Sequence, residues 1–546
     1  LISGYEVTVL TEDSVCHRAG EIGGVDGLYV VDQWAYHSRL YRAAAVVAVH
    51  PEFKDIQMVQ LNSFGCGLDA ISADQTAAIL ERHGKLHTLI KIDEGKNNGA
   101  VRIRIRSLLA SVKMKNERKR SDAASHPARA AIDGQRADEA RSQKTVSRVQ
   151  TKDRTVLCPP LSPHHFQFLE TAMRYAGIDF RVLPEGGRSA VELGLKYVNN
   201  DACYPAMVVI GQFIQALQSG EYDLDTTDCL YAQTGGACRA SNYVPLLRRA
   251  LDAAGFEGVR VLAANAQDNI GAERFAISAP VAWRSMIGML YGDTLMRLLY
   301  RTRPYEVTPG SADALYADWA RRCHENVTRG SWKAFKRDIA DMIRDFSGLK
   351  IAPLLKPRVG IVGEILVKYH ANANERLVDV IEAEGGEAVV PDMANFVLYC
   401  LHDPIYCNRH LSGGLLPCIL GWAGIRAINY MRRPVRDALC GTRFGEIHDI
   451  YDMAVRAESM VSCANQAGEG WLLASEMMAL IENGVRNVIC VQPFACLPNH
   501  VTGKGVMKEL KRGYQGVNIL ALDYDSSVSN VNQLNRIKLL MATAKA

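Results

Sequence analysis

The sequence predicts an α/β fold with duplicated doubly wound (Rossmann-like) parallel-sheet units and a helical insertion. Two observations lead to this prediction. Beyond residue 153, short apolar runs alternate with helical patterns, which is typical of a parallel sheet covered by helices. A motif near the start of the chain also recurs near its end, which indicates an internal duplication.

The composition narrows the classes of partner. The 546 residues are 48% hydrophobic and 22% charged, with a formal net charge of +4, so nothing favours nucleic acid or a membrane as partner. No apolar run approaches the roughly 18 residues of a spanning helix, and no export signal is recognisable, so we expect a cytoplasmic protein. The chain opens without Met in a strand-like run, so we expect an N-terminal truncation.

Five segments are expected from changes in pattern. Residues 1–110 form a partial first α/β unit. A basic flexible linker over 111–153 follows, because this stretch is rich in Lys, Arg, Ala and Ser and holds few large apolar residues. The remainder divides into an α/β unit over 154–280, a helical segment over 281–350 and a last α/β unit over 351–546.

Within these units the helix and strand patterns have clear boundaries. "HHFQFLETAMRYAG" predicts a helix that stops at Gly177, and "DFRVLP" the next strand. The helix in "CYPAMVVIGQFIQALQSG" has Pro205 in its first turn and Gly220 beyond its end. "TDCLYAQT" predicts a strand and "NYVPLLRRALDAAG" a helix. In the last unit, "RVGIVG", "NVICVQPF" and "VNILALDYD" predict strands.

The repeated motif contains a cysteine in both copies. Cys66 lies in "VQLNSFGCGLD" and Cys496 in "VQPFACLPNH". The same offset also aligns two acidic and two basic residues: Asp93 with Asp523, and Arg106 with Arg536. We therefore predict that one α/β unit occurs twice.

Three of the 14 cysteines share one expected position. Cys203 precedes a helix, whereas Cys238 and Cys496 lie in loops that follow strands and lead to helices. Ligands of open α/β sheets collect at the carboxyl ends of the strands, where helix N-termini stabilise thiolates and anionic clusters. Gly235 and Gly236 would let the backbone approach such a ligand closely.

Position alone leaves two explanations open. Three converging thiolates suit an iron–sulfur cubane, while small residues in tight turns are the more common reason for such cysteines. The absence of any CxxC motif argues against a zinc ribbon or a ferredoxin-type cluster. Less favoured site groups, each with a plain packing or helix-start explanation, are Cys158, Cys463, His164 and His165.

Several longer motifs carry a family resemblance. "NNDACYPAM", "QTGGACRASNY", "NSFGCGLDA", "AGEGWLL", "QPFACLPNHVTGKG" and "VNQLNRIKL" resemble the 2-hydroxyacyl-CoA dehydratase superfamily, most nearly the dehydratase-like C-terminal region of large activase-fused proteins of the double-cubane type. The resemblance implies an iron–sulfur cluster, either [4Fe–4S] or a double cubane. Its metal ligands here would be Cys203, Cys238 and Cys496, with Cys66 in the first half, whose sister ligands would lie upstream of Leu1.

The resemblance also implies a function. The expected protein is an anaerobic iron–sulfur redox protein that accepts low-potential electrons from an ATP-dependent activase, separate or fused upstream, and reduces a small or CoA-linked substrate. Glu469 and Lys504 are the candidate catalytic residues. No phosphate-binding loop is present in the chain. Two alternatives remain, an (R)-2-hydroxyacyl-CoA dehydratase component and a cluster-less scaffold that docks the activase; a homodimer is left open.

Overall fold

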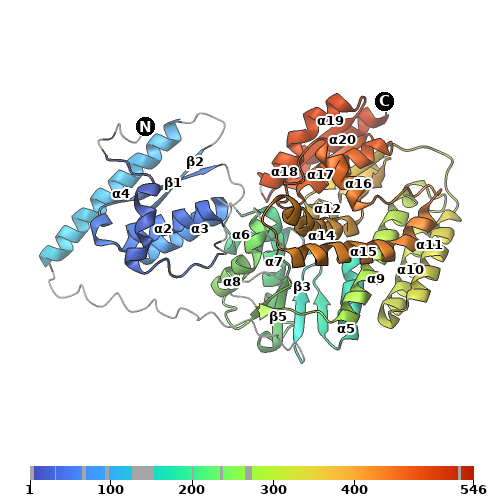
Figure 1. Ribbon diagram of the computed structural model, residues 1–546, viewed down its shortest axis with the longest axis horizontal. Helices are drawn as coiled ribbons and strands as arrows, with labels where there is room; N and C mark the ends of the chain where they lie inside the picture. The colour runs from blue at the N-terminus through green and yellow to red at the C-terminus, as the bar shows by residue number, and fades with distance from the viewer. Residues whose placement is uncertain are drawn as a thin grey trace. The chain divides into compact units, whose positions relative to one another are not determined.

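The computed structural model describes residues 5, 7–30, 32, 34–63, 69–92, 98–125, 153–199, 202–233, 238–264, 273–526 and 530–545. The chain divides into two compact units (Figure 1): residues 1–147 with 268–272, and residues 148–267 with 273–546. All pairings between the described strands are parallel, and helices separate the strands along the chain. The predicted α/β class is therefore confirmed.

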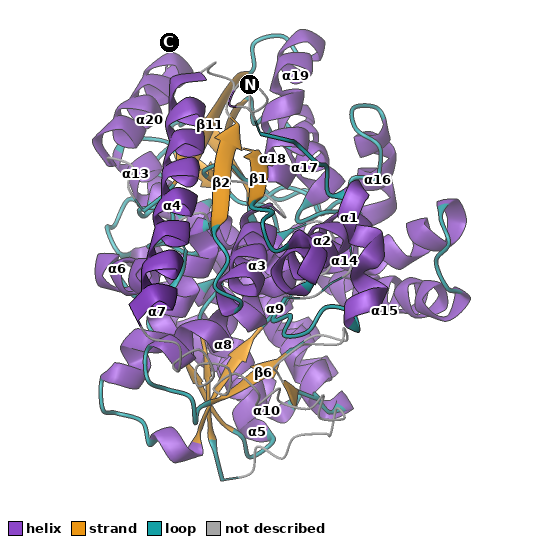
Figure 2. Ribbon diagram, turned by 90° about the vertical axis from the view of Figure 1, so that its left-hand side faces the viewer, coloured by secondary structure: helices purple, strands orange, loops and turns teal. Residues whose placement is uncertain are grey.

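The first unit contains a small parallel sheet. Strands β1 (Met58–Ser63) and β2 (His87–Ile92) run side by side and are joined by α3 (Asp69–Arg82) (Figure 2). Leu61 and Ile92, one on each strand, are 60% and 53% exposed, so this sheet leaves apolar side chains uncovered. The remaining elements of the unit are α1 (Asp13–Cys16), η2 (His17–Ile22), α2 (Ala35–Val49), η3 (Pro51–Phe53) and α4 (Asn98–Ser125).

Helix α4 extends into the range predicted as a linker. It continues from residue 98 to residue 125, and residues 126–152 lie outside the described part of the chain. Lys, Arg and Glu have high helix propensity, so a polar stretch can be helical without burying apolar surface. Ile105 and Leu108, near the start of α4, are buried. The composition that suggested a linker is thus equally compatible with a solvent-exposed helix.

The second unit begins with a doubly wound sheet in the order β4-β3-β5-β6-β7. From β3 the chain first adds β4 on one side and then β5 on the other, so the strand order reverses between β3 and β5. Such a switch point is where sheets of this kind bind ligands. Its strands are β3 (Thr155–Cys158), β4 (Asp179–Val182), β5 (Thr227–Tyr231), β6 (Arg260–Ala263) and β7 (Glu273–Arg274). Its helices are α5 (Pro163–Tyr175), α6 (Arg188–Tyr197), α7 (Tyr204–Gln218), η4 (Leu224–Thr226), η5 (Arg239–Asn242) and α8 (Tyr243–Ala253).

The predicted helix boundaries in this sheet are confirmed. Helix α5 ends just before Gly177, whose φ is 74°, a conformation that glycine adopts without strain. Helix α7 has Pro205 in its first turn and Gly220 beyond its end. A Cβ on Gly211 would collide with the carbonyl of Ala190, so the glycine permits close packing of α7 on α6.

Helices occupy most of the range 281–350, which the sequence predicted as a helical segment. It consists of α9 (Ala279–Tyr300), η6 (Arg303–Tyr305), α10 (Ser311–Arg329) and α11 (Trp332–Ser347). Its core is aromatic and includes the fully buried Trp319, Phe335 and Phe346.

A second doubly wound sheet follows in the order β11-β10-β8-β9. Its switch point lies between β8 and β10, and the connection from β9 to β10 is a run of helices. The strands are β8 (Arg358–Gly363), β9 (Glu387–Val389), β10 (Asn487–Pro493) and β11 (Asn518–Tyr524). The helices are α12 (Ile365–Tyr369), α13 (Leu377–Ala383), α14 (Met393–His410), α15 (Leu415–Leu439), α16 (Ile450–Glu458), α17 (Gly470–Glu482), α18 (Leu497–Thr502), η7 (Lys504–Val506), α19 (Met507–Gly513) and α20 (Asn530–Lys545).

The predicted duplication stays a prediction. The segments from β1 to α4 and from β10 to α20 share the order strand, helix, strand, helix, and in both the two strands are parallel neighbours. Cys66 and Asp93, on which the sequence alignment depends, lie outside the described residues.

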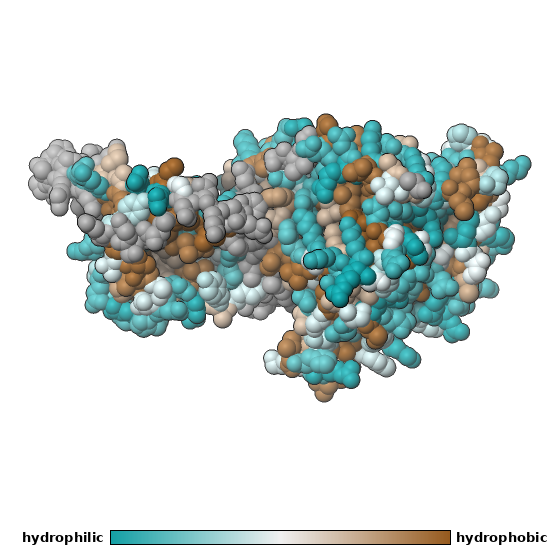
Figure 3. All heavy atoms as spheres, turned by 90° about the horizontal axis from the view of Figure 1, so that it is seen from above, coloured by the Kyte–Doolittle hydropathy of each residue, from teal (hydrophilic) through white to brown (hydrophobic). Residues whose placement is uncertain are grey.

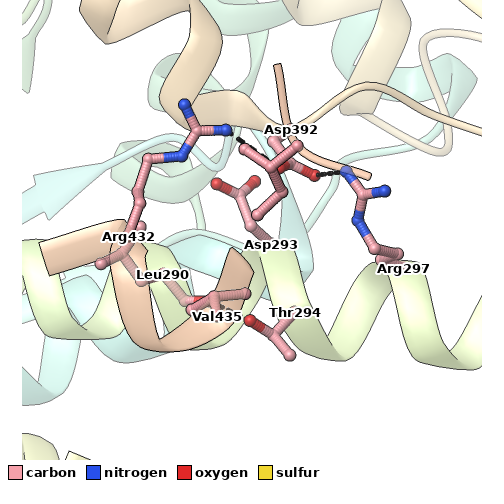
Figure 4. Close-up of a pocket in the computed structure, with 8 residues that line it drawn as sticks. Leu290, Asp293, Thr294, Arg297, Asp392, Arg432 and Val435 are labelled. Atoms are coloured by element: carbon pink, nitrogen blue, oxygen red, sulfur yellow. Dashed lines mark hydrogen bonds and ion pairs between the residues drawn. The ribbon is translucent and has the colours of Figure 1, made fainter. Parts of the chain in front are cut away.

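Buried charges connect the helical segment to the second sheet (Figure 4). Asp392, at the start of α14, lies 2.6 Å from Arg297 of α9 and 3.2 Å from Arg432 of α15. Neighbouring Asp293 accepts hydrogen bonds from two backbone N–H groups at the start of α14 and pairs with His165 at 2.9 Å. The two carboxylates and the two guanidinium groups are largely shielded from water, and their mutual pairing makes the burial of these charges tolerable.

The helices in the described part of the chain differ from membrane spans. No helix there combines the length and the apolar character needed to cross a bilayer. On the face in Figure 3, hydrophilic side chains are interspersed with several apolar groups, as on most protein surfaces.

Candidate functional site

The three cysteines singled out from the sequence all occupy N-cap positions. Cys203 precedes α7, Cys238 precedes η5, and Cys496 precedes α18, each with an extended backbone. The first N–H groups of a helix have no partner within the helix and carry partial positive charge. Each thiol therefore lies where a thiolate, or an anionic group bound to it, is stabilised.

These positions lie at the strand ends of both sheets in the second unit. Cys238 follows β5, and Cys496 follows β10, so each lies beside the switch point of its own sheet. Cys203 begins the helix that leads into β5. The expected location at the carboxyl ends of the strands is thus what the structure has.

Aromatic side chains surround Cys203. Its Sγ lies 2.6 Å from the hydroxyl of Tyr243, whose ring stacks on that of Tyr231 at 5.3 Å between centroids. Burial raises the pKa of Cys203, and the Arg239 guanidinium opposes that rise. Burial likewise raises the pKa of Cys238. Both thiols are therefore protonated at neutral pH, and binding of a metal or cluster would displace their protons.

Two carboxyl groups lie at the same place. Glu364 is the N-cap of α12 and accepts the N–H of Val367 at 2.9 Å, and Glu469 accepts the N–H of Ile365 at 2.9 Å. Asn499 of α18 joins them, since its amide donates to Glu469 at 3.2 Å and accepts the N–H of Glu364 at 3.2 Å. Burial and the charge of Glu469 raise the pKa of Glu364 to about 8. Glu364 therefore holds a proton at neutral pH.

Cys203, Cys238 and the carboxyl pair lie within electrostatic range of one another. Cys203 and Cys238 both interact electrostatically with Glu364, and Cys238 also interacts with Glu469. Helix α18, which Cys496 caps, contacts the Glu469 loop, because a Cβ on Gly468 would lie 3.2 Å from the ring of Pro498. Of the residues selected from sequence, the structure thus gathers Cys203, Cys238 and Glu469, with the helix that begins at Cys496.

The surroundings fit an iron–sulfur cluster. Within the described residues, the buried hydroxyls of Tyr231 and Tyr399 have no hydrogen-bond partner. Tyr231 interacts electrostatically with Cys203, and Tyr399 with Cys238 and Glu469, so both side chains lie within electrostatic range of these groups. Buried polar groups are rarely left without a partner, and a ligand with sulfide acceptors would provide one.

The candidate donor groups of this site are thiols and carboxyls. Among the described residues, no three Cys, His, Asp or Glu side chains are close enough to hold one metal ion. The three cysteines fit an iron–sulfur cluster in donor type.

An apolar rim borders this site. Phe494, Leu497 and Val501 flank Cys496 and are 44%, 43% and 46% exposed. Ala495, between Phe494 and Cys496, has a φ of 57°, a conformation that costs energy for a residue with a Cβ. The turn that presents Cys496 is thus held in a strained form at the protein surface.

Lys504 has another partner. Its ammonium group lies 2.7 Å from Asp523 at the end of β11, and Asp523 also accepts a hydrogen bond from Gln492 at 2.7 Å. In the described part of the chain, no hydrogen bond or ion pair joins Lys504 to Glu469. Cys66, Gly235 and Gly236, the remaining predicted site residues, lie outside the described residues.

The less favoured groups have structural surroundings. Cys158, at the end of β3, is buried, which raises its pKa to about 12. Cys463 is buried in the core beside α16, and burial raises its pKa to about 12. His164 lies 2.8 Å from the hydroxyls of both Tyr300 and Tyr316, and burial lowers its pKa to about 3.

Sequence reasoning missed Glu364, Asn499 and Tyr243. Glu364 directly follows the apolar strand "RVGIVG", and a polar residue at a strand end was a usable signal. Asn499 and Tyr243 are separated from their partners by long stretches of chain, so no local pattern identifies them.

The chain matches no protein-family model, and no curated protein matches its sequence.

The raised pKa of Glu364 predicts a pH dependence of stability. The ordinary pKa of 4.5 is raised to about 8, so the folded state binds a proton that the unfolded state releases, and stability falls as pH rises between these values. Glu364→Gln should remove this contribution, which is at most about 1.4 kcal/mol per pH unit. Urea unfolding of the metal-free protein at pH 6 and pH 8 measures it. Glu192→Gln, which changes an exposed carboxyl group, is the control. If the unfolding free energy of Glu364→Gln changes with pH as much as that of Glu192→Gln, the prediction is refuted.

Proposed function

We propose that the protein is an iron–sulfur redox protein of the 2-hydroxyacyl-CoA dehydratase type. It accepts low-potential electrons from an ATP-dependent activase and reduces a small or CoA-linked substrate. The observation that carries the proposal is the placement of Cys203, Cys238 and Cys496 at three helix N-caps around the Glu364–Glu469 pair. The motifs quoted from the sequence support the same assignment.

In this proposal the three cysteines hold the cluster, which supplies one-electron chemistry when bound. The N-termini of α7 and of the helices after Cys238 and Cys496 favour its negative charge. The stacked Tyr231 and Tyr243 exclude water from the side of Cys203. The neutral carboxyl of Glu364 adds no charge at neutral pH, and its proton is available for transfer to a bound substrate.

The activase is the proposed partner, and the exposed Phe494, Leu497 and Val501 offer it an apolar contact beside Cys496. We further propose that β1 to α4 repeats the unit from β10 to α20, with Cys66 as the counterpart of Cys496 in a second cluster. A cytoplasmic location is consistent with reduced cysteines.

A dehydratase is the second candidate, favoured by the carboxyl pair. Elimination of water needs a proton for the departing hydroxyl, and the protonated Glu364 is a suitable donor. The two candidates differ in electron use, because a reductase consumes reductant with each turnover and a dehydratase recycles one electron. The third candidate, an activase-docking scaffold, needs no iron.

The test is anaerobic purification followed by iron and acid-labile sulfide analysis and an absorption spectrum. The proposal expects about four iron atoms per cluster with a matching amount of sulfide. If the protein binds no iron when it is reconstituted under these conditions, the activase-docking scaffold is the one candidate function that remains. Steady consumption of a low-potential reductant with the activase and a candidate substrate supports the reductase, and turnover without it supports the dehydratase.

A further inference from the structure

Helix α15 exposes an apolar stripe on the side that faces away from its own core. Its buried residues follow a spacing of four and three and include Gly421, Ile425 and Ile428. A second set with the same spacing is exposed along the opposite side: Leu416, Leu420, Ala423, Ala427 and Tyr430. The ring of Tyr430, at the end of this set, also stacks on that of Trp332 of α11 at 5.6 Å between centroids. A spacing of four and three is that of a helix that packs along another helix. The stripe therefore has the pattern of a second helix interface.

The exposed apolar surface is large. Leu416, Leu420 and Tyr430 are 67%, 60% and 61% exposed. Next to them, Leu411, Leu415, Ile419 and Trp422 are 63%, 66%, 51% and 53% exposed. Together these side chains expose several hundred Å², comparable with the ~300–600 Å² of the largest patch on a typical monomer and with the ~800 Å² that each partner contributes to a stable interface.

The helix that carries the stripe is firmly attached. Helices α14 and α15 lie side by side (Figure 1), and α15 also packs against α11. A Cβ on Gly421 would collide with the carbonyl oxygen of Leu401 in α14, so the glycine allows unusually close contact of the two helices. The stripe is therefore presented on a rigid element.

The order of side chains along the stripe suits a second copy of the same helix. Ala423 is its central member, with Leu416 and Leu420 on one side and Ala427 and Tyr430 on the other. When two copies run antiparallel about a twofold axis at Ala423, Leu420 of each faces Ala427 of the other. In this layer a large residue faces a small one, whereas in the outer layers Leu416 of each copy lies opposite Tyr430 of the other. The small residue at the axis lets the helices approach closely.

The charges agree with this arrangement. Residues 411–425 contain no Asp, Glu, Lys or Arg, whereas Arg426, Arg433 and Arg436 lie in the second half of α15 and are exposed. One exposed acidic residue, Asp437, pairs with Arg433 at 3.5 Å, so this half remains basic in balance. Antiparallel packing places each basic half beside the uncharged half of the other copy. Parallel packing would bring the basic halves together, and like charges in contact are destabilising.

We propose that this stripe is the interface of a homodimer, formed by antiparallel packing of α15 on α15 of a second chain. The proposal does not depend on the proposed redox function. It names the residues that exclude water between the chains, with Leu416 and Leu420 as the main apolar anchors and Ala423 at the axis.

Sedimentation of the full chain over a range of concentrations provides the first test. A species with twice the mass of one 60.1 kDa chain is expected. Ala423→Glu places two carboxylates at the axis and should weaken the dimer on the order of 100-fold. Leu539→Glu is the control, because Leu539 of α20 is 70% exposed outside the stripe, and it should leave the mass unchanged. A monomeric parent chain, as expected if another part of this chain or a different protein covers the stripe, would overturn the proposal, and so would a dimer that survives Ala423→Glu.

Cross-linking tests the orientation. Ala423→Cys should form a disulfide between two chains under mild oxidation, with peptide mapping to separate it from links made by native cysteines. Asp437→Cys lies on the same side of α15 and is exposed, but antiparallel packing holds its two copies about 40 Å apart. A link between two copies of residue 437, or none between copies of residue 423, would contradict the proposed packing.

Discussion

Replacing Cys203, Cys238 or Cys496 by Ala should abolish the absorption of the reconstituted protein and lower its iron content about tenfold or more. Each substitution removes one thiolate from a helix N-cap in the proposed cluster site. Loss even of a group that only supports a ligand commonly costs 10–100-fold in affinity, so loss of a ligand should cost at least as much. Iron and sulfide analysis after anaerobic reconstitution measures the effect.

Cys440→Ala is the matched control, because Cys440 is exposed at the end of α15, away from the three helix N-caps. It should keep its full iron content. Circular dichroism of the metal-free variants shows whether each still folds. A folded Cys203→Ala protein with undiminished iron would refute the ligand assignment, whatever its catalytic activity.

Asp392→Asn should destabilise the second unit by about 3–5 kcal/mol, the usual result of removing one partner from a buried ion pair. Asp392 is buried between Arg297 and Arg432, which would keep their charges without a carboxylate. Burial alone would raise the pKa of Asp392, yet the two arginines hold it below its ordinary 3.8. Its contribution is therefore present above that pH and is lost as the pH falls through the lower folded value. The urea unfolding midpoint measures the loss.

Asp318 is a suitable comparison because it also pairs with two arginines, Arg321 at 2.8 Å and Arg322 at 2.7 Å, but on the surface. Exposed pairs contribute roughly 0–1 kcal/mol, so Asp318→Asn should change stability little. Equal losses in the two variants would show that burial of Asp392 between its arginines is not what stabilises this region.

Local pattern sufficed for much of the fold. Pro205 and Gly220 marked the ends of α7, and Gly177 the end of α5, because proline and glycine impose backbone angles on their own. Cys203 was placed directly before α7 by the same reasoning, whereas Cys238 was placed only in a loop between a strand and a helix. Helix α4 was harder, since Lys, Arg and Glu are common both in exposed helices and in linkers.

The composition of the site could be predicted only in part. Glu469 was predicted from the sequence, but its partners Glu364 and Asn499 were not. Both come next to Glu469 only in the folded protein, and Glu364 is separated from it by more than a hundred residues of chain. Lys504 was selected for its place at a helix start, yet its charge is paired with Asp523. The tertiary structure decides which charged groups pair, and no short stretch of the sequence shows that pairing.

The division of the cysteines between two sheets affects how the protein is made. Cys238 belongs to the first sheet of the second unit and Cys496 to the second, with the helical segment between them in the chain. At ordinary rates of synthesis, Cys496 leaves the ribosome on the order of tens of seconds after Cys238. During this delay Cys203 and Cys238 have emerged with the first sheet, while Cys496 has not yet emerged. In the proposed site, the full set of cysteine ligands is therefore complete only after Cys496 has emerged, and the high pKa of Cys203 and Cys238 keeps them in the less reactive protonated form until then.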